Sequence, residues 1–177
     1  MKKIILGVSS SIAAYKACEL VRLFVKAGHS VHCVLTENAT RLVTPLTLET
    51  LSGNPVYTQT FVDDRRAMGH IELKEDAALM VVAPATANII GKFANGIADD
   101  LLSTTFLSVT CPVLMAPAMN PNMWMHPAVQ ANIDRLTAWG VRFVEPAEGR
   151  VACGDLGYGK LADIDTIYRV ASDVLEK

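Results

Sequence analysis

Short polar side chains follow two apolar runs near the start of the chain, and their chemistry suits a phosphate group. Ser9–Ser11 come directly after residues 4–8, and Thr36 follows residues 31–35. Hydroxyls at the start of a helix can bind one phosphate monoester together with backbone N–H groups and the positive end of the helix dipole. We therefore expect a mononucleotide site, with FMN as the natural candidate. The alternative is that the serines only cap the helix that follows.

The same turn lacks the residues of two other kinds of nucleotide site. A dinucleotide site needs the pattern GxGxxG, because glycines let the backbone approach a pyrophosphate, and serines stand there instead. The glycines and lysine of a nucleoside-triphosphate loop are also missing. The sequence therefore favours neither NAD binding nor nucleoside-triphosphate hydrolysis.

A histidine and a cysteine stand in segments that could carry catalysis. His70 follows Gly69 just ahead of a polar stretch, and Cys153 begins a segment with three glycines within six residues, followed by Lys160. Taken alone, His70 is more typical of a surface or capping histidine. The glycine-rich segment is typical of an irregular, mobile loop, either a flap or an ordinary surface loop.

The remaining histidines and cysteines are interpreted as structural. They are His29 and His32 beside the second apolar run, His126 at a turn, Cys18 and Cys33 in the core, and Cys111 before a strand. The four cysteines form no CxxC pair, and no histidine stands at metal-ligand spacing. The sequence therefore predicts no metal site and no redox dithiol, and it favours a reduced, cytoplasmic chain.

Buried strands and amphipathic helices must position these residues. Apolar runs without alternation predict strands at residues 4–8, 31–35, 79–83, 113–116 and 141–144. Helical spacing of apolar residues predicts helices at 13–27, 45–51, 127–139 and 164–175, the last one capped by Asp163. The order strand, helix, strand predicts one doubly wound α/β domain over residues 1–177, with a Rossmann- or flavodoxin-like parallel sheet flanked by helices.

Ligands of such sheets bind beyond the carboxyl ends of the strands. Four segments follow predicted strands and are rich in hydroxyls, amides or proline: residues 9–11, 36, 84–88 and 117–120. We expect residues 84–88 to begin a helix, and we expect all four segments to meet at one crevice.

Composition and charge exclude several classes of function. The chain has 177 residues, of which 51% are hydrophobic and 19% charged, so it can bury a core and is not a disordered chain. The net charge of −2 and the absence of a basic stripe argue against a nucleic-acid partner. The first apolar run is too short for a signal peptide, and residues 77–85 are less than half a membrane span, so we expect no membrane partner.

Five motifs in the same order resemble the homo-oligomeric flavin-containing cysteine decarboxylases. They are SSIAAYK at 10–16, GHIEL at 69–73, PATAN at 84–88, PAMNPNMW at 117–124 and ACGD at 152–155. The last motif, with the glycines after it, is similar to the phosphopantothenoylcysteine decarboxylase branch of coenzyme A biosynthesis. Many bacterial members continue into a ligase domain, whereas this sequence ends at Lys177 with no ligase domain expected. Ser10 also stands where a glycine is frequent.

The resemblance implies FMN-dependent decarboxylation of 4′-phosphopantothenoylcysteine to 4′-phosphopantetheine. Oxidation of the thiol carbon would give a thioaldehyde that accepts the electrons left by carbon dioxide, and the resulting enethiol would then be reduced. By the same resemblance, His70 acts as a base or positions the substrate, and Asn120 holds the substrate carboxylate. Cys153 would donate the proton in the reductive step.

Binding residues and partners are implied in the same way. The implied FMN contacts are Ser10, Ser11, Thr36, Thr86, Ala87 and Asn88. The implied substrate contacts, besides Asn120, are Met119, Ala152, Gly154 and Lys160. The family forms homotrimers, sometimes assembled as a dodecamer of four trimers, with flavin sites between subunits. The alternatives are a peptidyl-cysteine decarboxylase, a flavin prenyltransferase of related fold, and a non-catalytic FMN-binding regulatory subunit.

Overall fold

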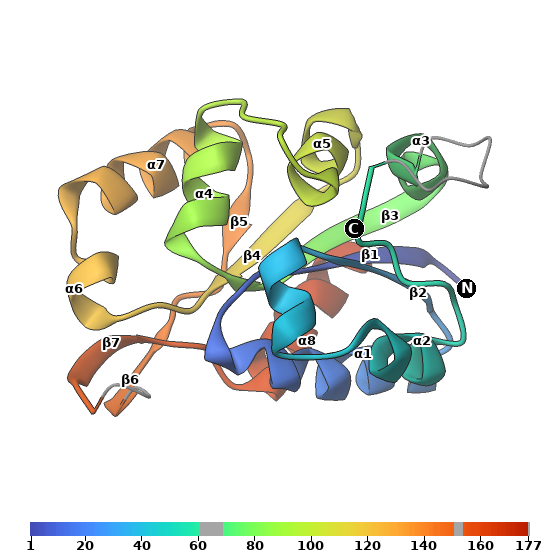
Figure 1. Cartoon of the computed structure of the whole chain (residues 1–177), viewed down its shortest axis with the longest axis horizontal. Helices are drawn as coiled ribbons and strands as arrows, with labels where there is room; N and C mark the ends of the chain where they lie inside the picture. The colour runs from blue at the N-terminus through green and yellow to red at the C-terminus, as the bar shows by residue number, and fades with distance from the viewer. Residues whose placement is uncertain (61–68, 151–153, 177) are drawn as a thin grey trace.

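The computed structural model describes residues 1–60, 69–150 and 154–176. Its centre is a parallel sheet of five strands in the order β2-β1-β3-β4-β5 (Figure 1). The strands are β1 (Lys3–Val8), β2 (Ser30–Leu35), β3 (Ala77–Ala85), β4 (Val113–Pro117) and β5 (Arg142–Phe143). This order confirms the predicted doubly wound, flavodoxin-like sheet. The topological switch point, where the order of the strands reverses, lies between β1 and β3, and sheets of this order bind their ligands there.

Helices cover both faces of the sheet (Figure 1). One face packs against η1 (Ile12–Lys16), α1 (Ala17–Lys26), η2 (Glu37–Arg41), α2 (Pro45–Ser52) and α8 (Ile164–Leu175). The other packs against α3 (Gly69–Lys74), α4 (Ala87–Ala94), α5 (Leu101–Ser108) and α7 (Pro127–Ala138), and α6 (Pro121–Trp124) precedes α7. Within β1, Ile4 and Leu6 enter one core and Ile5 enters the other, and all three are fully buried. Burial on both faces explains why the strands read as unbroken apolar runs.

Several boundaries differ from the sequence-based expectation. The predicted first helix begins as the 3₁₀ segment η1, whose N-cap is Ser11, before α1 starts at Ala17. Strand β3 extends to Ala85, so residues 84 and 85 belong to the strand, and α4 begins only after the cap Thr86. Asp163 occupies the N-cap position of α8, but its side chain makes no capping hydrogen bond.

The glycine-rich segment after Cys153 corrects a prediction. Residues Leu156–Lys160 form strand β7, which pairs antiparallel with β6 (Ala147–Arg150), rather than an irregular loop. Strand β7 also contacts the segment after β4, because the Met119 N–H donates to the Gly159 carbonyl oxygen at 2.9 Å. The glycines therefore serve close packing of a strand.

None of the helices in the described ranges is long and apolar enough to cross a membrane.

Candidate functional site

The carboxyl ends of three neighbouring strands bring the predicted phosphate-binding segments together. Val8 at the end of β1 pairs with Leu35 of β2, and β1 also pairs with β3. Ser9, directly after β1, is buried; its hydroxyl donates to the Pro84 carbonyl oxygen at 2.8 Å and accepts from the Thr86 N–H at 2.9 Å. Ser9 thus ties the turn after β1 to the start of α4. This role of Ser9 was not predicted from the sequence, in which Ser9 stands in one run with Ser10 and Ser11.

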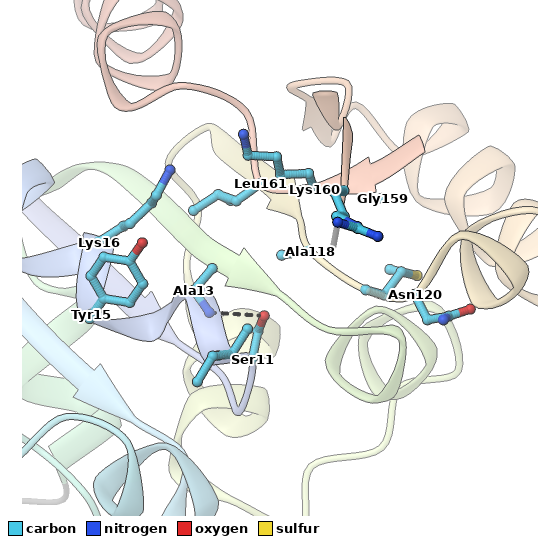
Figure 2. Close-up of a pocket in the computed structure, with 12 residues that line it drawn as sticks. Ser11, Ala13, Tyr15, Lys16, Ala118, Asn120, Gly159, Lys160 and Leu161 are labelled. Carbon is cyan, nitrogen blue, oxygen red and sulfur yellow. Dashed lines mark hydrogen bonds between the residues drawn. The ribbon is translucent and has the colours of Figure 1, made fainter. Parts of the chain in front are cut away.

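The hydroxyls of the other two serines differ in how far they are free to bind a ligand. Ser11 caps η1, because its hydroxyl accepts from the Ala13 N–H at 3.3 Å (Figure 2). The capping alternative is therefore true for Ser11, although a hydroxyl that accepts one bond can still donate another. Ser10 is exposed at the edge of the same turn.

Thr36, at the end of β2, presents an unsatisfied hydroxyl at this edge. Its Oγ1 is buried and has no hydrogen-bond partner within the described part of the chain. Its N–H donates to the Val8 carbonyl oxygen at 3.1 Å, which fixes it beside the end of β1. A buried polar atom without a partner is unfavourable, so a donor or acceptor from a bound molecule would be stabilising there.

The start of α4 completes this edge of the sheet. Thr86 caps the helix through a bond from the Ile89 N–H at 3.4 Å, Ala87 is half-buried and Asn88 is exposed. These residues, with Ser10, Ser11 and Thr36, follow three adjacent strands. The arrangement fits a flavin mononucleotide, with small hydroxyls for a phosphate and an amide for polar ring atoms.

A cavity of about 370 Å³ opens beside this edge, between η1, the segment after β4, and the β6–β7 hairpin (Figure 2). Lys16, Arg150 and Lys160 line it, and no aspartate or glutamate is among its lining residues in the described part of the chain. Neither lysine nor Arg150 has an ion-pair partner among the residues placed by the structure. The cavity is therefore electropositive and suits an anionic ligand.

Asn120 lies at the opposite end of the cavity from Lys16 and has a defined orientation (Figure 2). Its Oδ1 accepts from the Asn122 N–H at 2.8 Å as the N-cap of α6. Its Nδ2 therefore faces the other way and donates to Asp155 Oδ2 at 2.6 Å. The amide already binds a carboxylate.

Three predicted substrate residues besides Asn120 can be placed. Met119 and Lys160 line the cavity with Asn120. Gly154 is exposed outside the lining, and its carbonyl oxygen accepts from Arg150 Nε at 3.3 Å. Ala152 and Cys153 lie outside the described residues.

His70 stands apart from this cavity. It belongs to α3, which lies at the far end of the molecule from α6 (Figure 1), and it is not one of the lining residues. Its Nδ1 is buried and finds no hydrogen-bond partner in residues 1–60, 69–150 or 154–176. One chain alone therefore does not bring His70 to Asn120.

Four residues of the site were not predicted from the sequence: Lys16, Arg150, Asp155 and Gly159. Lys16 and Asp155 were inside quoted motifs, but nothing in the sequence indicated what they contact. Arg150 and Gly159 lie on the hairpin, whose pairing brings them to the cavity.

The histidines interpreted as structural have local partners in two cases. His126 Nδ1 accepts from the Ala128 N–H at 3.2 Å as the N-cap of α7, and His32 Nε2 bonds the Ser30 hydroxyl at 3.1 Å. His29 Nδ1 is buried without a partner in the described ranges, and burial lowers the pKa of this histidine.

The cysteines that can be placed behave as packing residues. Cys33 is fully buried, and burial raises the pKa of its thiol to about 12. Cys18 and Cys111 are half-buried, and burial raises the pKa of each thiol. No group of histidine, cysteine, aspartate or glutamate side chains in the described ranges could hold a metal ion.

Comparisons with known proteins identify relatives along the whole chain. The sequence profile of the family described as Flavoprotein matches residues 1–175. The coenzyme A biosynthesis bifunctional protein CoaBC of Bacillus subtilis is 49% identical over 96% of this chain and 42% of the relative. The chain thus spans about two fifths of the length of this bifunctional relative. The probable phosphopantothenoylcysteine decarboxylase of Streptococcus mutans is 41% identical over 98% of this chain and 99% of the relative.

Solved structures agree with the sequence comparison. A cysteine-to-serine variant of PPC decarboxylase complexed with pantothenoylaminoethenethiol superposes with a TM-score of 0.90 at 30% identity, covering 99% of both chains. The FMN-dependent cysteine decarboxylase SpaF superposes with a TM-score of 0.84 at 31% identity, covering 100% of this chain and 98% of the other.

Proposed function

Because the chain belongs to the Flavoprotein family, we propose that it is an FMN-dependent decarboxylase that converts 4′-phosphopantothenoylcysteine to 4′-phosphopantetheine in coenzyme A biosynthesis. The observation that carries this proposal is the oriented amide of Asn120, which donates to a carboxylate at the end of a cation-lined cavity. Such a cavity has one end for the carboxylate that leaves and another for a phosphate. The proposal includes a cytoplasmic location, in keeping with the biosynthetic relatives.

The cofactor part of the proposal rests on the edge formed by β1, β2 and β3. Ser10, Ser11 and Thr36 would hold FMN together with Thr86, Ala87 and Asn88, and FMN would satisfy the buried Thr36 hydroxyl. When bound, FMN supplies the removal of an electron pair from the thiol carbon and its later return. The protein's own residues bind, orient and protonate.

Asn120 would bind the substrate carboxylate through Nδ2. An uncharged amide donates a hydrogen bond to the anion without the strong stabilisation that a lysine or arginine would give. The carboxylate is therefore held in place but can still lose its charge as carbon dioxide. Oxidation at the thiol carbon provides the thioaldehyde that accepts the remaining electrons.

The cations favour a phosphorylated substrate over a peptide. Lys16, Arg150 and Lys160 line the cavity, and none of the lining residues that the structure describes is acidic, which suits the charge of a phosphate. A peptidyl-cysteine decarboxylase would not need this charge. The enethiol carried by the PPC decarboxylase variant is the type of intermediate expected here.

We propose a homotrimer, alone or as four trimers, as the family resemblance implies, and the separation of His70 and Asn120 in one chain supports a site shared between copies. His70 of one copy would then act at the Asn120 of the next, as a base or by positioning the thiol. The buried Nδ1 of His70 would gain a partner in that assembly. Cys153 is assigned the proton donation of the reductive step from its motif alone.

Reconstitution with FMN followed by a substrate comparison tests this function. The purified protein should show the visible absorption of bound flavin and should decarboxylate 4′-phosphopantothenoylcysteine in preference to a peptide that ends in cysteine. A protein that does not bind FMN would contradict the proposed cofactor. A preference for the peptide would support a peptidyl-cysteine decarboxylase. Flavin binding without turnover of either would support a regulatory subunit.

A further inference from the structure

The hydrogen bond between Asn120 and Asp155 places a carboxylate of the protein on the donor proposed for the substrate. The distance from Asn120 Nδ2 to Asp155 Oδ2 is 2.6 Å. Asn120 cannot exchange its two amide atoms without losing the bond from the Asn122 N–H to Oδ1. The contact is therefore a defined amide-to-carboxylate hydrogen bond.

The surrounding backbone fixes Asp155 at this place. Asp155 directly precedes β7, whose Gly159 carbonyl oxygen accepts from the Met119 N–H. A Cβ at Gly157 would stand 3.0 Å from Pro121 Cβ, so β7 also packs closely against the start of α6. Contacts of β7 on both sides of Asn120 thus hold the Asp155 carboxylate near the amide.

We propose that Asp155 is a positioning residue whose carboxylate competes with the substrate carboxylate for Asn120 Nδ2. The inference rests on the proposed function, because it takes the substrate carboxylate to bind at that amide. Two carboxylates on one amide nitrogen would repel each other, so binding of the substrate displaces Asp155 from Asn120. Before substrate binds, Asp155 keeps the amide satisfied and oriented.

The proposal gives Asp155 an effect on substrate binding but none on product binding. A substrate with its carboxylate must displace Asp155, whereas the decarboxylated product leaves the Asn120–Asp155 bond in place. Removing the Asp155 side chain should therefore tighten binding of a carboxylate ligand and leave binding of the product unchanged. A residue that only supported the fold would weaken both.

Calorimetric titration of the FMN-loaded protein can separate these effects. The carboxylate ligand is 4′-phosphopantothenoylserine, which has no thiol to oxidise, and the ligand without a carboxylate is 4′-phosphopantetheine. Asp155→Ala should bind the serine analogue roughly three- to tenfold more tightly, as expected for removal of one competing hydrogen bond. Its affinity for 4′-phosphopantetheine should stay within about twofold of the wild type.

Two controls make the test specific. Glu148→Gln removes the same charge from the exposed face of β6, so it should change neither affinity if the effect comes from the Asn120 contact. In an Asn120→Ala background, adding Asp155→Ala should change nothing further, because the shared donor is gone. Asp155→Asn, which keeps the size of the side chain, should also bind the serine analogue more tightly than the wild type does.

An unchanged or weaker affinity of Asp155→Ala for the serine analogue would overturn the proposal. An equal increase in affinity for both ligands would also overturn it, since that would result from the loss of a negative charge and not from the contact with Asn120. A wild-type protein that binds neither ligand would instead contradict the proposed function itself, and the inference would fall with it.

Discussion

The main chain of Gly159 lies against the main chain of Met119 so closely that no side chain fits between them. The Met119 N–H donates to the Gly159 carbonyl oxygen at 2.9 Å, and a Cβ at position 159 would stand 2.3 Å from the Met119 carbonyl oxygen. Gly159 also has a φ of +141°, which other residues rarely adopt. This contact brings the hairpin to the segment that carries Asn120.

Gly159→Ala should therefore displace the hairpin. We expect a loss of about 2 kcal/mol in the free energy of unfolding, from the backbone clash and the strained φ, and a raised KM. Gly91→Ala is the matched control, because its Cβ would meet only Asn132 Nδ2 at an ordinary 3.7 Å. Chemical denaturation and steady-state kinetics would measure both, and an unchanged KM in Gly159→Ala would contradict the role of this contact.

Thr36→Val separates cofactor binding from stability. The substitution keeps the shape but removes a buried hydroxyl without a partner in the described chain, so the FMN-free protein should be as stable as the wild type or slightly more stable. FMN affinity should fall by about tenfold, equivalent to one lost hydrogen bond.

A second threonine provides the comparison for Thr36. The Thr105 hydroxyl is buried and donates to the Leu101 carbonyl oxygen at 2.7 Å, so Thr105→Val should cost stability and spare FMN binding. Fluorescence titration of FMN would give the affinities. Normal FMN affinity in Thr36→Val would remove Thr36 from the cofactor site.

His70→Asn should abolish carbon dioxide release and leave FMN bound, since His70 is assigned to the substrate. His126→Asn is a suitable control because asparagine caps helices well and the His126 side chain caps α7. Release of labelled carbon dioxide and the visible spectrum would be recorded for both variants. Loss of flavin from His70→Asn would show that the assignment of His70 to the substrate is wrong.

The ion pairs of Lys92 predict a dependence of stability on pH. Lys92 Nζ lies 2.7 Å from one carboxylate oxygen each of Asp99 and Asp100. Burial raises the pKa of Asp100, but the hydrogen bonds from Lys92 and Ser103 outweigh it, and the pKa lies below its ordinary value. This stabilisation is present above the pKa of the unfolded chain and is lost as the pH falls through the folded pKa.

Lys92→Met should thus lower the free energy of unfolding by about 1 kcal/mol at neutral pH, and this difference should shrink in acid. Lys26→Met, at an exposed lysine without an ion pair in the described ranges, is the control. Urea unfolding at several pH values would test the claim. A difference between Lys92→Met and the wild type that stays constant with pH would contradict it.

The strands could be predicted because they are buried on both faces, which leaves unbroken apolar runs such as residues 79–83. Helix α5 was not predicted, since its sequence LLSTTFLS mixes apolar and hydroxyl residues. Both Ser103 and Thr105 are buried, so no separate polar face marks the helix. Strand β7 was wrongly expected to be irregular. Its glycines allow close packing on distant residues, Gly159 on the Met119 backbone and Gly157 on the Pro121 side chain, and they do not mark a local preference for a loop.

The site was predictable only in part for a similar reason. Thr36 and Asn120 follow strands, so the topology of the sheet alone places them at its carboxyl edge. The contact between Asp155 and Asn120 depends on how the hairpin packs on a distant segment. The separation of His70 from Asn120 depends on the packing of α3, which the motif around His70 does not encode.

The most direct test of the proposed reaction measures, under anaerobic conditions, how many equivalents of carbon dioxide are released per flavin site. Wild-type protein loaded with FMN should release many equivalents of carbon dioxide from 4′-phosphopantothenoylcysteine and form 4′-phosphopantetheine, because the electron pair returns in each cycle. In Cys153→Ser, oxidation and decarboxylation should still occur, but a serine hydroxyl is too weak an acid to replace the thiol. This variant should release about one equivalent per site, retain reduced flavin and accumulate the enethiol. Fully reduced 4′-phosphopantetheine from Cys153→Ser, or a wild-type protein that stops after about one equivalent, would contradict the account.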